Sequence, residues 1–135
     1  MPPTVIVVPF YNETGRPDLD AVARSVGDAT VARLASAERI PRLSVIGNAP
    51  SLVNPFARDD IQGIALRLDA QFVVIGQLKS DEGGLRVIAH LVRAADMKHV
   101  WAETFDDPSF ALPAQGRVAE ETAAAVTAAV HQGQP

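Results

Sequence analysis

The stretch from Phe72 to Arg93, FVVIGQLKSDEGGLRVIAHLVR, decides the fold of this chain. Two runs rich in β-branched residues, FVVIGQLKS and LRVIAHLVR, flank the tetrapeptide DEGG, whose glycines can adopt positive φ. This pattern predicts an antiparallel β-hairpin in which Gly76 lies opposite Ala89. Because both residues are small, a helix can approach the sheet closely at that point.

The segment HVWAETF, residues 99–105, follows a short turn and is predicted to be the third strand of a meander. Strand parity places one set of side chains on a first face: Val74, Leu78, Val87, Leu91 and Ala102. A second face receives Val73, Ile75, Gln77, Ile88, His90, Val92, Trp101, Glu103 and Phe105. Since this second face is too apolar for open water, we expect either the C-terminal helix or another protomer to cover it. We favour the helix, with the other helices on the first face. Trp101→Ala is then predicted to cost about 3–5 kcal/mol.

Upstream of the hairpin, two short apolar runs predict strands, the first of which is expected to be covered on both faces. These runs are Val5–Phe10 (VIVVPF) and Leu43–Gly47 (LSVIG). Between them, apolar residues recur at helical spacing from Leu19 to Leu34, which predicts one long helix or two short helices divided at Gly27.

Two further helices complete the prediction. Apolar residues at helical spacing from Ile61 to Leu68 indicate a helix before the hairpin, and the alanine-rich residues 113–132 indicate another at the C-terminal side. The resulting order, β-α-β-α-β-β-β-α, predicts an α/β fold with a mixed five-stranded sheet and three helices. A length of 135 residues with 47% hydrophobic residues fits a single domain over residues 1–135.

The composition excludes several classes of function. A net charge of −4, with basic residues scattered along the chain, argues against a surface that tracks nucleic-acid phosphates. No apolar run reaches the roughly 18 residues that a membrane span needs, so we predict no membrane insertion by this domain. The first residues lack the basic lead and cleavage site of a signal peptide, so any targeting segment would lie outside this sequence. Zero cysteines exclude disulfides and leave the compartment open.

Four motifs in series carry a resemblance to a known family. They are PFYNETG (9–15), LDAQFVVIGQL (68–78), LRVIAHLVRAAD (85–96) and HVWAETFDD (99–107). Together they resemble the TolB amino-terminal-like domain, which occurs in bacterial membrane-bound transcriptional regulators and class III adenylate cyclases with tetratricopeptide repeats. The resemblance implies an α/β module similar to anticodon-binding domains and without catalysis of its own.

The polar residues around the tryptophan do not form a chemical site. His99 falls at a turn, and neither His90 nor His131 is spaced to complete a metal site with it. Glu103 and Asp106 lack an accompanying nucleophile or oxyanion-stabilising group, so no acid–base pair is expected. We therefore predict no catalytic residue, no metal site and no cofactor. Structural roles are assigned to Trp101, Phe105 and Gly76.

Two polar loops follow the first two strands, where open α/β sheets place ligands. Candidate ligand-binding residues in these loops are Asn12, Glu13, Thr14, Asn48, Ser51 and Asn54. Ordinary turn and capping roles explain the same residue types, so the loops support a ligand site without requiring one.

Three functions remain open. The leading prediction is a non-catalytic sensory or protein-interaction domain of a bacterial signalling or transcriptional regulator, excised from a larger protein. The alternatives are a small-ligand receptor and an envelope-assembly accessory module similar to outer-membrane lipoproteins. The expected partners are another protein, other domains of the same chain or a second copy in a homodimer, and no nucleic acid. The location is periplasmic for a membrane-bound regulator and cytoplasmic otherwise.

Overall fold

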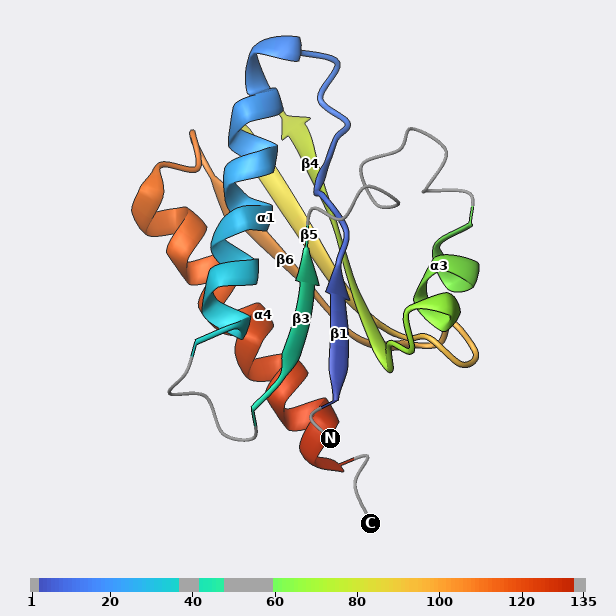
Figure 1. Ribbon diagram of the computed structural model, residues 1–135. Coiled ribbons are helices and arrows are strands. Elements are labelled where there is room, and N and C mark those ends of the chain that lie inside the picture. Colours follow the sequence, from blue (N-terminus) through green and yellow to red (C-terminus); the bar gives the residue numbers. More distant parts are fainter. Residues whose placement is uncertain (1–2, 37–41, 48–59, 133–135) are drawn as a thin grey trace.

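The computed structural model of the protein describes residues 3–36, 42–47 and 60–132 (Figure 1). The described strands are β1 (Thr4–Val7), β2 (Tyr11–Asn12), β3 (Ser44–Gly47), β4 (Phe72–Asp81), β5 (Gly84–Arg93) and β6 (His99–Asp107). The described α-helices are α1 (Asp20–Leu34), α3 (Ile61–Arg67) and α4 (Leu112–Gln132), and a 3-10 turn at Pro17–Leu19 leads into α1. The predicted α/β fold class is confirmed.

One mixed sheet contains all the described strands, in the order β3-β1-β4-β5-β6, with β2 also paired to β4. The strand β1 runs parallel to β3 and β4, whereas β4, β5 and β6 form an antiparallel meander. The sheet has six strands rather than the predicted five because Pro9 has no N–H for a ladder bond. The run VIVVPF therefore stops pairing at Pro9, and pairing with β4 resumes at Tyr11.

The predicted hairpin forms in the expected register, with Gly76 opposite Ala89. Its turn closes at Gly84, which has φ 148° and whose missing Cβ would meet the backbone of Pro108. A residue with a side chain would be strained there by both backbone conformation and contact.

The predicted pairing of β6 is wrong. Trp101, Glu103 and Phe105 lie opposite Leu91, Ala89 and Val87, on the face that was assigned to Ala102. The turn between β5 and β6 spans residues 94–98, and an irregularity next to Leu91 leaves Val100 as an extra residue in β6. Such a bulge changes the register, and an odd shift turns every side chain of a strand to the other face.

The helix layers also differ from the prediction. The helices α1 and α4 pack side by side on one face of the sheet, and α3 lies on the opposite face (Figure 1). The apolar stripe of α4, including Val118 and Val126, packs with Val87 and Phe105 in the larger core. The prediction failed because it placed Trp101 and Phe105 on the wrong face and then sought a helix to cover them there.

The two faces of the sheet therefore carry cores of different size. The larger core, under α1 and α4, includes Val5, Val7, Val74, Leu78, Leu85, Val87, Ala89, Leu91 and Phe105 from the strands. The smaller core, under α3, includes Ile6, Val8 and Val73 from the strands and Ile61, Ile64 and Ala65 from the helix.

A phenylalanine ring sets the distance between α1 and the sheet. Phe10 is 5% exposed and lies between Gly27 of α1 and Gly76 of β4. A Cβ at Gly76 would collide with the ring of Phe10, whereas a Cβ at Gly27 would sit 3.4 Å from its Cδ1 atom. Gly27 thus faces the core inside one continuous helix, and it neither breaks nor divides α1.

Candidate interaction surface

The first predicted ligand loop is bonded mainly to itself and to α1. Asn12 donates from Nδ2 to the carbonyl of Arg16 at 2.8 Å and to Asp20 Oδ1 at 2.7 Å. Its Oδ1 accepts from the backbone N–H of Thr14 at 3.1 Å and from Thr14 Oγ1 at 2.6 Å. These bonds fix the turn that leads into α1, as Asn side chains do in Asx turns.

The remaining candidate ligand residues divide into two groups. Glu13 forms an ion pair with Lys79 at 3.2 Å, and its backbone N–H donates to the carbonyl of Leu78 at 2.8 Å. Asn48, Ser51 and Asn54 lie outside the described residues. The strands β1 and β3 are adjacent and parallel, so their carboxyl ends meet at one edge. Ligand binding at this edge stays a prediction.

The residues that were assigned structural roles occupy three different environments. Phe105 is buried at 4% exposure in the larger core. Trp101 is half-buried at the margin of the same core. The ring of Phe10, rather than a helix, packs directly against Gly76.

Part of the sheet face on the α3 side is not covered by the described helices. We define the open face by two rows of neighbouring residues: Gln77, Ile88 and Thr104, and beside them Ile75, His90 and Ala102. Ala102 and Thr104 are exposed, and the other four side chains are half-buried. The small core under α3 ends beside Ile75, so α3 covers the other end of this sheet face.

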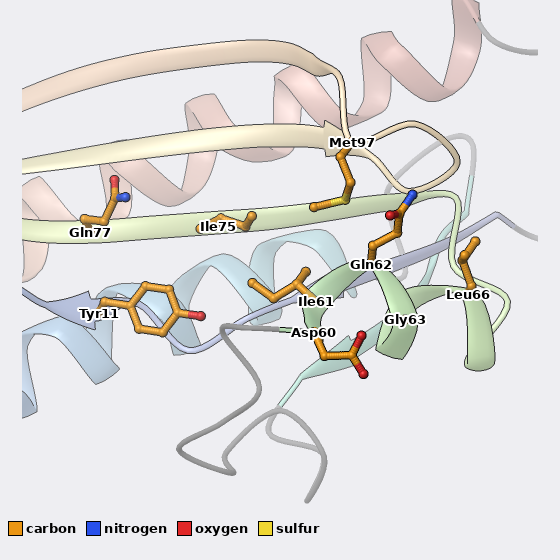
Figure 2. Close-up of a pocket in the computed structure, with 9 residues that line it drawn as sticks. All are labelled: Tyr11, Asp60, Ile61, Gln62, Gly63, Leu66, Ile75, Gln77 and Met97. Atoms are coloured by element: carbon orange, nitrogen blue, oxygen red, sulfur yellow. The ribbon is translucent and has the colours of Figure 1, made fainter.

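A pocket of about 660 Å³ lies at the boundary between the open face and α3. Figure 2 shows the side chains around it. It is lined by Tyr11, Asp60, Ile61, Gln62, Gly63, Leu66, Ile75, Gln77 and Met97. The pocket is open to solvent, and its lining mixes apolar side chains with Gln62, Gln77 and Asp60, which pairs with Arg67 at 3.2 Å. Its volume is within the range of roughly 300–1,000 Å³ that ligand pockets occupy.

A polar cluster lies within the open face. His90 Nε2 lies 3.0 Å from Gln77 Oε1, whereas His90 Nδ1 is buried and has no hydrogen-bond partner in the described part of the chain. The ring of His99 stands edge-on to the ring of His90, with 5.2 Å between ring centroids. Burial lowers the pKa of His90 below its ordinary value, and His99 lowers it further.

Ion pairs border the open face on the side of the hairpin turn. Arg86 Nε lies 2.7 Å from Asp106 Oδ1, and Arg86 also approaches Asp81 at 3.6 Å. The hydrogen bond with Asp106 is the largest cause that raises the pKa of Arg86 above its ordinary value. The same bond lowers the pKa of Asp106. These charges lie at the surface, and one arginine faces two carboxylates, so the group carries a small net negative charge that solvent screens.

Among the described residues, no three His, Cys, Asp or Glu side chains are grouped so that they could hold a metal ion. No helix in the described ranges is long and apolar enough to cross a membrane.

His90 and Gln77 were not predicted as site residues, because strand parity assigned them to a face that a helix would cover. The signal that was available is the alternation along β4 and β5, where polar Gln77 and His90 interrupt the apolar side chains of one face. A fully covered sheet face seldom carries such residues.

Neither a protein-family model nor a curated protein matches this sequence. Solved structures do match the fold. The PelC dodecamer from Paraburkholderia phytofirmans is 18% identical with a TM-score of 0.61, over 92% of this chain and 87% of that chain. TolB from Acinetobacter baumannii is 20% identical with a TM-score of 0.61, over 96% of this chain and 28% of that chain. Lipoprotein GNA1162 from Neisseria meningitidis is 15% identical with a TM-score of 0.57, over 99% of this chain and 100% of that chain.

These likenesses establish a TolB-like α/β fold, which agrees with the family resemblance of the sequence motifs. At such identities the likeness concerns the fold alone, because one fold serves many functions. The regulator and adenylate cyclase setting stays a prediction.

Proposed function

We propose that this chain is a non-catalytic assembly domain of the bacterial cell envelope, in which copies of the chain associate through the open face. The observation that carries the proposal is the unequal covering of the sheet. Two long helices, α1 and α4, cover one face, whereas the seven-residue α3 covers only part of the other.

The residues of the open face have the chemistry of a contact surface. Ile75 and Ile88 supply apolar area, the small side chains of Ala102 and Thr104 permit close approach, and Gln77 and His90 already bond to each other. A partner therefore has few unsatisfied polar groups to dehydrate when it covers the face. An apolar centre with a polar, ion-paired rim is typical of protein interfaces.

The comparisons support both the assembly and the location in this proposal. One structure with the same fold over most of its length is a dodecamer, and another is a lipoprotein. Because the likeness concerns the fold, these names motivate the choice of envelope assembly over a signalling role. A second copy of the chain is the occupant that the dodecamer suggests for the open face.

Native mass spectrometry and analytical ultracentrifugation test this proposal. The wild-type chain is expected to form a species heavier than the monomer at micromolar concentration. Ile88→Arg places a charge in the centre of the open face and is expected to give a monomer that is still folded by circular dichroism. Leu112→Arg is the matched control, because Leu112 is 76% exposed at the start of α4 and should leave association unchanged.

Two outcomes would contradict the proposal. A wild-type chain that stays monomeric at high concentration would rule out self-association. An Ile88→Arg chain that keeps the wild-type mass would place the contact elsewhere. For the location, fractionation of the full-length gene product is expected to recover it with the envelope.

A further inference from the structure

We infer that His90 and His99 make the open face sensitive to acid, so that protonation of His90 weakens the contact between copies. The titration itself concerns the single chain, and only the weakening of the contact rests on the proposed function. The inference starts from three side chains that converge on the open face: His90 of β5, Gln77 of β4 and His99 of β6.

The hydrogen bond with Gln77 selects one form of neutral His90. Because Gln77 Oε1 accepts, His90 Nε2 carries the proton and Nδ1 holds a lone pair. A second proton must therefore enter at Nδ1, which is buried and lacks an acceptor among the described residues. A buried N–H without an acceptor costs free energy, and the charge of an imidazolium increases that cost.

The surroundings of His90 offer no carboxylate to compensate. On its neighbouring strands it faces Ile75 and Gln77 of β4 and Ala102 of β6, which are uncharged, and the titratable ring of His99. When His99 is protonated, its charge opposes a second positive charge on His90.

The charged groups of the same sheet face lie farther away or are already paired. Lys79, Arg86 and Asp106 occupy a row two rows along from His90, and Asp81 lies one row farther, next to the hairpin turn. Asp81 pairs with Arg86 at 3.6 Å. On α3, Asp60 at the start of the helix pairs with Arg67 at 3.2 Å. The position of His90 therefore favours its neutral form.

The direction of the pH effect follows from linkage. The pKa of His90 is lower in the folded chain than in the unfolded chain, so the unfolded chain binds more protons in the window between the two values. The stabilisation linked to neutral His90 is fully present at a pH above its pKa in the unfolded chain. It is lost as the pH drops towards its pKa in the folded chain. A second copy that covers the face buries His90 further, so association and protonation of His90 oppose each other.

A histidine-selective NMR titration of the wild-type chain, diluted until it is monomeric, and of its His99→Gln variant under the same conditions tests the histidine pair. His90 is expected to titrate below histidine's ordinary pKa of about 6.5, and its pKa should rise when His99 is removed. Below that pKa, the ring should lose the chemical shifts of a single neutral tautomer. A His90 that titrates at or above the ordinary value, or that ignores His99→Gln, would overturn the inference.

The contact is tested by measuring mass at pH about 7.5 and about 5.5, the range in which histidine changes its charge. The wild-type chain should associate at the higher pH and dissociate at the lower one. His90→Gln, which keeps a polar side chain without the titration, should associate at both. If His90→Gln also dissociates in acid, the switch lies elsewhere. If the wild-type chain associates at neither pH, the proposed function and the contact part of the inference both fail, while the titration still decides the histidine pair.

Discussion

Replacement of Gly76 by alanine tests how closely α1 and Phe10 approach the sheet. The new Cβ would overlap three ring atoms of Phe10, which is buried and held on its other side by Gly27. Overpacking of this kind costs about 1–3 kcal/mol. Replacing a strand glycine with alanine by itself stabilises the fold by about 0.5–1 kcal/mol, because the unfolded chain has less conformational freedom to lose. Because the overlap is with a whole ring, we expect a net loss of about 2 kcal/mol in the free energy of unfolding.

Gly27→Ala is the matched control on the opposite side of the same ring. Its Cβ would sit 3.4 Å from Phe10 Cδ1, an ordinary contact. Alanine inside a helix is also up to about 1 kcal/mol more favourable than glycine in free energy, so this variant should be as stable as the wild-type chain or more stable. Urea unfolding followed by the fluorescence of Trp101, the single tryptophan, measures both variants.

A smaller side chain at position 10 provides a second check. Phe10→Leu should lower stability by itself, because it leaves a cavity between α1 and β4. Combined with Gly76→Ala, it should cost less than the sum of the two single changes, since the overlap is relieved. Additive costs, a Gly76→Ala chain as stable as wild type, or an equal loss in Gly27→Ala would refute the packing described for Phe10.

Three other predictions follow from single contacts. Gln115→Met should cost about 1–3 kcal/mol in urea unfolding, because buried Gln115 donates to the carbonyl of Phe110 at 2.8 Å and methionine leaves that carbonyl unpaired. Trp101→Ala should cost about 1–2 kcal/mol by circular dichroism, less than expected for a fully buried tryptophan, because the ring is half-buried; a loss above that range would place the ring deeper. Arg86→Gln should raise the pKa of Asp106 towards its ordinary value in an NMR titration, and an unchanged pKa would show that the pair does not persist in solution.

The order of elements could be predicted from the sequence because periodicity is a local property. The alternation in β4 and β5 set their register correctly, since the short turn before Gly84 leaves little freedom. The strand β2 was missed because a two-residue strand carries no period that could be detected.

The register of β6 depends on features that parity cannot show. The turn before it contains Met97 with φ 57°, and the bulge at Val100 adds one residue to one strand only. Neither a bulge nor a positive φ at a methionine has a sequence signature as strong as that of glycine. A single odd shift then exchanged the faces and misplaced α4, although the strand itself was predicted.

The candidate surface could not be predicted for a related reason. Which face of a sheet stays open depends on where long helices pack, and that is decided by contacts between distant parts of the chain. The sequence placed His90 and Gln77 together on one face correctly. It could not indicate that α3, with only seven residues, would leave them uncovered.

The position of α4 beside α1 governs when this chain can fold during synthesis. The helix α4 is the last described element to be made, yet it completes the larger core against α1 and β5. Until it leaves the ribosome, Leu91 and Val87 on the finished meander face water, and the growing chain is exposed to aggregation. A chain truncated after β6 is therefore expected to expose this apolar sheet face and to aggregate rather than to fold as a smaller stable domain.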